Sequence, residues 1–222
     1  FAKQVDAYTE YSLFNTALQT QDPAKKAVLL GTLEKQAPES GYWAQGEGLY
    51  FLALAQSGDM PAAVAVAEKV IARGQGTEEM LAAAGEFYLR QNKEPEKVLD
   101  YSSKLVALTN SRSRPDGVSE ADWQKRKDYF LGMGQWMAGV QLSTQGKFGE
   151  ADKALRAALP LVEGNDQVKA AALYNLGLAN QWLKNLADAI KFYEQCTAID
   201  SPFRPLAAGN LKGLKSGYRV IK

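Results

Sequence analysis

The 222-residue sequence contains no histidine and only one cysteine, Cys196. The lack of histidine removes the commonest general acid and base and the commonest zinc ligand. It also excludes Ser-His-Asp and Cys-His catalytic sites built from this chain alone. A single cysteine cannot form an intrachain disulfide or a cysteine-rich metal centre. We therefore expect no metal and no cofactor, and we predict that the chain is not an enzyme.

The sequence also lacks a large net charge and a long apolar run. Its 26 basic and 25 acidic residues leave a net charge of +1, so no global field favours nucleic acid or an anionic membrane. No apolar run approaches the roughly 18 residues that span a bilayer, and no signal peptide is visible. The chain begins with Phe1 instead of methionine, which a removed leader or a shortened chain would explain.

Helix-forming residues are what the sequence has in abundance. Ala, Leu, Glu and Lys fill the segments between Gly and Pro, and the alternation typical of strands is hard to find. Hydrophobic residues make up 46% of the chain and charged residues 23%, which is ordinary for a soluble globular protein. The composition predicts an all-α protein.

Start and stop signals divide the chain into about eleven helices. Asp22 and Asp59 are each followed closely by a proline, and this combination is typical of a helix start. The polar stretch "NSRSRPDGVSE" at 110–120 predicts a loop. Ser119 and Asp122 then resemble a capping box before a long helix. Short loops between the helices place successive helices antiparallel.

The segment "LYNLGLANQWLKNLADAIKFYEQC" carries a regular spacing of small and bulky residues. Gly177 is followed after twelve residues by Ala189, after four more by Tyr193 and after three more by Cys196. The same spacing occurs earlier, at Gly139, Ala151, Leu155 and Ala158. Small residues at such positions let paired helices approach closely, and bulky residues fill the gaps between them.

This pattern resembles the tetratricopeptide repeat, although Asn180 occupies the usual aromatic position and Pro202 comes one residue late. Further upstream, Phe51 stands where a small residue is expected. The resemblance extends over nearly the whole chain and implies a right-handed α-solenoid that forms a single domain over residues 1–222. It implies about five antiparallel helix hairpins and a C-terminal capping helix, at 5–38, 41–74, 77–109, 120–162, 167–200 and 203–218.

A second resemblance concerns "APESGYW", in which Pro38, Ser40 and Tyr42 carry the pattern. The stretch is similar to the "P-x-S-x-Y" repeats of bacterial cell-envelope tetratricopeptide proteins. It favours a bacterial source, and the cell envelope or periplasm over the cytoplasm.

The resemblance further implies a scaffold that binds a protein or peptide, because the first helices of such repeats line a concave groove. The positions expected near this groove are Trp136, Val140, Tyr174, Leu178, Gln181 and Trp182. Aromatic anchors suit an extended peptide or a partner helix. The alternative is that these side chains simply pack between repeats. None of them can clamp a carboxylate terminus, so binding of that kind is disfavoured.

Two other functions stay open. Lys125, Arg126 and Lys127 form a possible basic patch for nucleic acid or an acidic partner, although such runs are more often a solvated helix face. An RNA-binding helical repeat is therefore one alternative, which the balanced charge disfavours. An enzyme on an α/α scaffold is another, and it would need carboxylate pairs facing one cleft. Cys196 lies at a small, packed position and is interpreted as a core residue.

Overall fold

The computed structural model describes the backbone of residues 2–218 and the side chains of residues 7–217. Within that range the protein has eleven α-helices, one short 3-10 helix and no strand, which confirms the all-α prediction. None of the described helices is long and apolar enough to span a membrane. The side chain of Val5, where the first hairpin is expected to begin, lies outside the described side chains, while the backbone of the first helix begins at Ala2.

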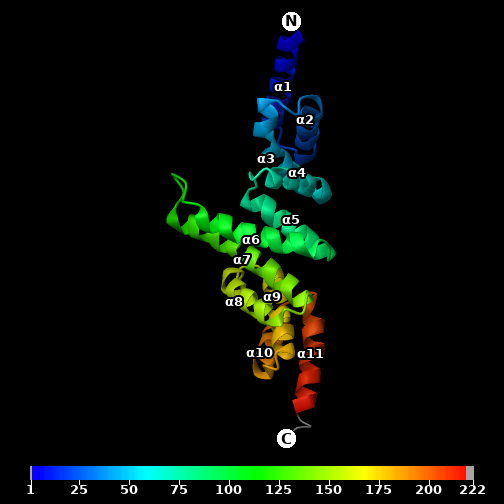
Figure 1. Ribbon diagram of the computed structural model, residues 1–222, viewed down its shortest axis with the longest axis vertical. Helices are drawn as coiled ribbons and strands as arrows, with labels where there is room; N and C mark the ends of the chain where they lie inside the picture. The colour runs from blue at the N-terminus through cyan, green and yellow to red at the C-terminus, as the bar shows by residue number, and fades with distance from the viewer. Residues whose placement is uncertain (1, 219–222) are drawn as a thin grey trace. The chain divides into compact units, whose positions relative to one another are not determined.

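The chain divides into two compact units, residues 1–87 and residues 88–222. In the first unit α1 packs against α2, α2 against α3 and α3 against α4, and α1 also contacts α3; Figure 1 shows α2 beside α1. The core of this unit includes Phe51, Ala67 and Met80. Its helices are α1 (Ala2–Gln19), α2 (Pro23–Gln36), α3 (Gly41–Gln56), α4 (Met60–Ala72) and most of α5 (Glu78–Gln91).

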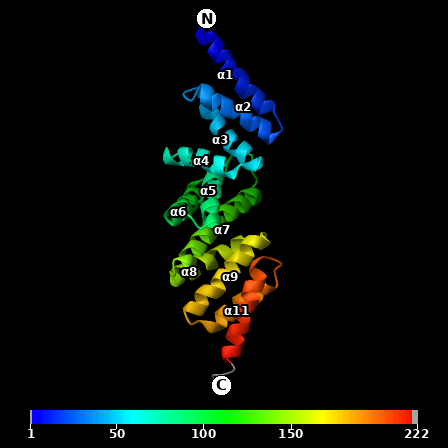
Figure 2. The same ribbon diagram turned by 90° about the vertical axis from the view of Figure 1, so that its right-hand side faces the viewer.

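In the second unit, successive helices from α6 onward also pack against one another. The first helices of the hairpins contact each other as well, α7 with α9 and α9 with α11; Figure 2 shows α11 beside α9. The elements are α6 (Pro95–Ser111), α7 (Glu120–Thr144), α8 (Phe148–Ala158), η1 (Leu159–Leu161), α9 (Asp166–Trp182), α10 (Leu186–Thr197) and α11 (Phe203–Tyr218). Consecutive packing of this kind is that of a helical repeat. Its handedness stays a prediction.

The predicted helix starts are confirmed by their side-chain hydrogen bonds. The Asp22 carboxylate accepts from the backbone N–H of Ala24 at 2.9 Å, and Asp59 accepts from Ala62 at 3.2 Å. The Ser119 hydroxyl accepts from the backbone N–H of Asp122 at 3.1 Å. These bonds satisfy N–H groups that have no partner inside the helix, which is why sequence alone located them.

The turns inside four of the hairpins repeat the same backbone geometry. Equivalent positions are held by Phe51, Gly85, Gly139 and Gly177. In each case the backbone N–H eight residues later donates to the backbone carbonyl three residues later, with N···O distances of 2.9 to 3.0 Å. The residue seven positions later has a positive φ in every case: Gly58 (89°), Asn92 (52°), Gly146 (73°) and Lys184 (65°). This arrangement is a Schellman turn, which closes a helix through a left-handed residue. Four hairpins therefore share one register, including the hairpin that begins with α3.

The glycine positions explain how closely the helices of a hairpin approach. A Cβ on Gly139 would lie 2.5 Å from Leu155, and a Cβ on Gly177 would lie 2.5 Å from the Tyr193 ring. In the α3–α4 hairpin the sizes are exchanged, because buried Phe51 takes the glycine position and Ala67 takes the position of the bulky residue. Exchanging a large and a small residue conserves the packed volume.

Candidate functional site

The predicted binding residues differ in their exposure. Trp182 is 61% exposed, whereas Trp136 is only 6% exposed, and the Trp136 Nε1 has no hydrogen-bond partner in the described part of the chain. The remaining four are half-buried: Val140, Tyr174, Leu178 and Gln181. For Trp136 the burial agrees with the alternative that the sequence left open, packing between repeats. Its helix, α7, contacts α6, α8 and α9, and this indole packs inside the unit.

Tyr174 and Gln181 hold neighbouring helices together. The Tyr174 ring lies 6.0 Å from the Tyr193 ring and 5.5 Å from the Phe203 ring. The Tyr193 hydroxyl donates to Gln181 Oε1 at 3.0 Å and accepts from Asn210 Nδ2 at 3.0 Å. Burial of Tyr193 raises its pKa to about 12. This arrangement joins α9, α10 and α11, and no sequence pattern predicted it.

Trp182 belongs to an aromatic pair formed by two successive hairpins. Its indole stacks on Phe148 with ring centroids 5.5 Å apart and an angle of 2° between the ring planes. Phe148 begins α8 and Trp182 ends α9. Leu183, the next residue, is 40% exposed. We refer to Phe148 and Trp182 as the aromatic stack. The repeat spacing predicted Trp182, but Phe148 was missed because its partner lies 34 residues further along the chain.

The hydrogen bonds of Asn180 explain why this position departs from the repeat pattern. It is fully buried, and its Nδ2 donates to the Asp152 carboxylate at 2.6 Å and to the Leu176 carbonyl at 2.9 Å. Arg156 forms ion pairs with Asp152 at 2.9 Å and with Asp188 at 2.5 Å. The hydrogen bond from Arg156 to Asp152 raises the pKa of the guanidinium. A polar network thus replaces the usual aromatic contact between α8, α9 and α10.

Cys196 is a core residue, as its position in the repeat predicts. The thiol is fully buried and donates to the Ala170 carbonyl at 3.4 Å. Burial raises its pKa to about 11. Because the thiolate is the nucleophilic form of cysteine, this side chain is unreactive near neutral pH.

The predicted basic patch lies on the first turns of α7. Lys125 and Arg126 are exposed and Lys127 is half-buried, and the Arg126 guanidinium lies 4.8 Å from the centre of the Phe130 ring. The aromatic residue of this run, Trp123, is 7% exposed. It therefore provides no open surface on which a base could stack.

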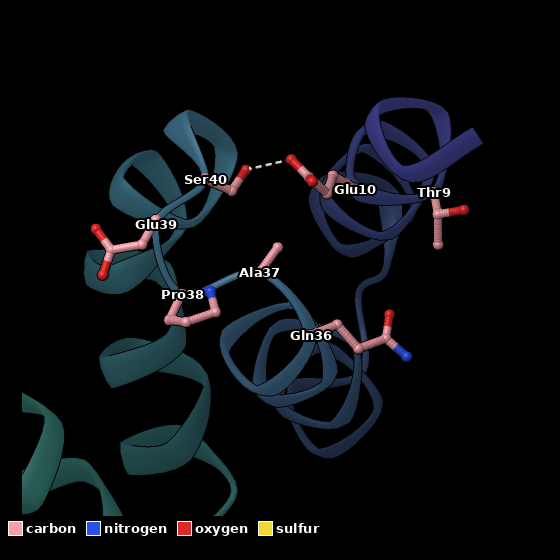
Figure 3. A pocket seen from close by; sticks show the side chains of 7 residues that line it. All are labelled: Thr9, Glu10, Gln36, Ala37, Pro38, Glu39 and Ser40. Carbon is pink, nitrogen blue, oxygen red and sulfur yellow. Dashed lines mark hydrogen bonds between the residues drawn. The ribbon is translucent and has the colours of Figure 1, made fainter. Parts of the chain in front are cut away.

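A shallow hollow in the first unit contains three residues of the "P-x-S-x-Y" stretch (Figure 3). Its wall is formed by Thr9, Glu10, Gln36, Ala37, Pro38, Glu39 and Ser40. The Ser40 hydroxyl donates to the Glu10 carboxylate at 2.7 Å, while the Glu39 carboxylate points away from Glu10. Ser40 also caps α3. These residues thus join α1 to α3, and their two carboxylates do not face each other as a catalytic pair would.

Among the side chains of residues 7–217, no three His, Cys, Asp or Glu come together as a group that could hold a metal ion. Exposed and half-buried apolar side chains gather on α9, and this surface is the candidate site.

A comparison with protein families identifies the segment that contains α9 and α10. The family model described as tetratricopeptide repeat matches residues 170–203. These residues form a tetratricopeptide repeat. The match includes Gly177, Ala189, Tyr193 and Cys196, whose packing is described above. The tetratricopeptide repeat is a module typical of protein-interaction scaffolds. No curated protein matches the chain.

Proposed function

We propose that the protein is a non-catalytic scaffold that binds a protein or peptide partner on one face of α7 and α9. We call this surface the α7–α9 face. Its members are Val140, Tyr174, Leu178, Gln181 and Trp182. The observation that carries the proposal is the exposure of Trp182, an indole that is 61% open to solvent within a tetratricopeptide repeat.

The exposure of Trp182 is unusual within this protein. The other three tryptophans, Trp43, Trp123 and Trp136, are between 6% and 7% exposed. Exposed tryptophan is enriched at the centres of protein interfaces, because one indole buries a large area when a partner covers it. Leu183 is also 40% exposed and extends the apolar surface beside it.

The neighbouring residues of the face are already held in place. Tyr174 packs against Tyr193 and Phe203, and Gln181 accepts a hydrogen bond from Tyr193. A partner would therefore bind a surface whose side chains lose little freedom on association. Such preorganisation increases affinity without adding contacts.

Several groups that might suggest catalysis have structural partners, which supports a binding role. Asp152 and Asp188 are both paired with Arg156. The Cys196 thiol is buried, with a pKa raised to about 11. A scaffold requires none of these groups to react.

The proposal is tested with a displayed library of random twelve-residue peptides, selected against the wild-type chain. The selected peptides are synthesised, and their Kd values are measured for wild type, Trp182→Ala, Leu178→Ala and Val28→Ala. Val28 is 69% exposed on α2 and serves as the matched apolar control. Loss of an interface anchor weakens binding by about 30-fold, so we expect that loss for Trp182→Ala, a smaller loss for Leu178→Ala and no change for Val28→Ala. Equal Kd values in wild type, Trp182→Ala and Leu178→Ala would show that the α7–α9 face is not the binding site.

A further inference from the structure

Two lysines stand next to the aromatic stack. Lys147 directly precedes Phe148, and Lys184 follows Trp182 by two residues. Both are exposed, and neither side chain makes an ion pair or hydrogen bond with any residue between 7 and 217. Some other lysines of this unit are paired, as Lys169 is with Glu163 and Lys215 with Glu194. The stack is therefore bordered by two cations whose charge is not neutralised.

Two of the three carboxylates near these lysines in the sequence are engaged by another side chain. Asp152 and Asp188 are both engaged by Arg156. Glu150 is exposed, but it lies two residues after Phe148 in α8. Residues two apart in a helix do not face the same side.

Lys184 occupies a backbone position that lysine rarely adopts. Its φ is +65°, and the equivalent turn residues in the other three hairpins are Gly58, Asn92 and Gly146. Glycine and asparagine enter the left-handed region with the smallest penalty. A lysine there is strained, and strained residues gather where they serve a function.

The overall charge of +1 conceals an uneven distribution. Residues 1–87 contain six basic and eleven acidic residues, a net charge of −5, whereas residues 88–222 contain 20 basic and 14 acidic residues, a net charge of +6. The unit that holds the aromatic stack is thus the basic one. Its field favours the approach of an acidic partner.

From these observations we propose that the aromatic stack binds an acidic segment of a partner protein, in which an aromatic or aliphatic side chain is flanked by carboxylates. The inference rests on the proposed scaffold function and specifies its partner. The apolar side chain covers the Trp182 indole, and the flanking carboxylates pair with Lys147 and Lys184. A peptide suits this surface better than a nucleic acid, because Lys147 and Lys184 could pair with only two phosphates of a continuous backbone.

The local charge is measurable without any partner. Trp182 is the exposed tryptophan of the four, so collisional quenching of tryptophan fluorescence reports mainly on the stack. We expect iodide, an anion, to quench more strongly than caesium at equal ionic strength. Trp182→Phe removes the quenchable signal and confirms its source. The Lys147→Gln/Lys184→Gln variant is expected to remove the difference between the two ions. Equal quenching by iodide and caesium in wild type would overturn the proposal.

The peptides selected from the display library provide the second test. We expect them to be rich in Asp and Glu beside an aromatic or aliphatic residue. Replacing their acids by Asn and Gln, or using Lys147→Gln/Lys184→Gln, is expected to weaken binding about fivefold at low salt, with less effect at high salt. Lys153→Gln, which removes another exposed lysine of α8, is the matched control and should leave Kd unchanged.

The outcomes separate this inference from the scaffold function. Selected peptides without acidic residues that still lose affinity with Trp182→Ala overturn the acidic partner and leave the scaffold intact. Peptides that bind Trp182→Ala and wild type with equal Kd overturn both the acidic partner and the proposed scaffold surface. Tighter binding of a 20-nucleotide oligouridylate than of the peptides, sensitive to the same lysine variant, would assign the stack to nucleic acid. Self-association in sedimentation velocity that the lysine variant abolishes would assign it to a second copy of the chain.

Discussion

At the scale of single residues, Lys184 affects both the stability of the fold and the proposed binding site. It closes α9 in a left-handed conformation that the other hairpins give to Gly58, Asn92 and Gly146. For a residue with a Cβ, this conformation costs about 1–2 kcal/mol. The same lysine follows Trp182 of the aromatic stack by two residues. The backbone strain and the proposed binding role therefore belong to one residue.

We expect Lys184→Gly to raise the free energy of unfolding by about 1 kcal/mol, because glycine relieves the strain at this φ. Urea denaturation of wild type and variant measures the change. Gly146→Lys makes the reverse change at the equivalent turn and should lower stability by a similar amount. A Lys184→Gly variant that is no more stable than wild type would show that the turn is not strained. The same variant is expected to bind acidic peptides more weakly.

Because Cys196 and Tyr193 are buried, we predict that the folded protein loses stability at alkaline pH. In the unfolded chain the thiol ionises near 9.0 and the phenol near 10.0, whereas in the folded state burial raises these pKa values to about 11 and about 12. The folded state therefore favours the protonated forms. Their contribution is fully present below pH 9 and is lost as the pH rises towards 12.

The measurement is the urea midpoint between pH 7.5 and 11. We expect it to fall above pH 9, and to fall less steeply in Cys196→Ala, which removes the thiol. Native Cys196 should also resist a thiol reagent that reacts rapidly once the chain is unfolded. Rapid modification of the native protein would contradict the buried, protonated thiol.

At the scale of the helices, the closest approach within a hairpin depends on glycine. An added Cβ at Gly177 would lie 2.5 Å from the ring of Tyr193, which is fully buried and held between Gln181 and Asn210. The ring cannot move aside without breaking these hydrogen bonds. The α9–α10 contact is therefore intolerant of even one extra carbon atom.

We expect Gly177→Ala to lower the free energy of unfolding by about 2 kcal/mol, the usual penalty for overpacking a core. Gly209→Ala in α11 is the matched control, because nothing lies within 4 Å of the added Cβ there. That change should stabilise the helix by about 0.5–1 kcal/mol. Thermal or urea unfolding distinguishes the two. Equal stability of Gly177→Ala and wild type would show that the hairpin can open at this point.

At the scale of the whole molecule, the two units have separate cores. Leu30 is fully buried in the first unit and Leu155 in the second. In repeat proteins stability is approximately a sum over repeats and their nearest neighbours. A cavity made in one unit should therefore act mainly within that unit.

Leu30→Ala is expected to lower local stability by about 2–5 kcal/mol, with faster hydrogen exchange in α1 to α4 than in α8 to α10. Leu155→Ala should produce the opposite distribution. Hydrogen exchange measured by mass spectrometry on both variants compares the two patterns. A uniform increase across all helices would mean that the chain opens in a single cooperative step.

The sequence by itself determined the helices, their turns and much of the repeat register. Asp22, Asp59 and Ser119 cap their helices as predicted, because capping depends on residues within a few positions of each other. The offsets among Gly177, Ala189, Tyr193 and Cys196 follow from the geometry of one hairpin, so they were also visible in the sequence.

The tertiary structure decided which aromatic residues are open to a partner. Trp136 and Tyr174 occupy equivalent repeat positions, three residues before Gly139 and Gly177, yet Trp136 is buried and Tyr174 is half-buried. Trp136 lies in α7, which contacts α6, α8 and α9, whereas the Tyr174 ring in α9 lies beside Tyr193 and Phe203. The partnership of Phe148 with Trp182 likewise joins residues 34 positions apart. Exposure and stacking depend on contacts between distant elements, and no local pattern encodes them.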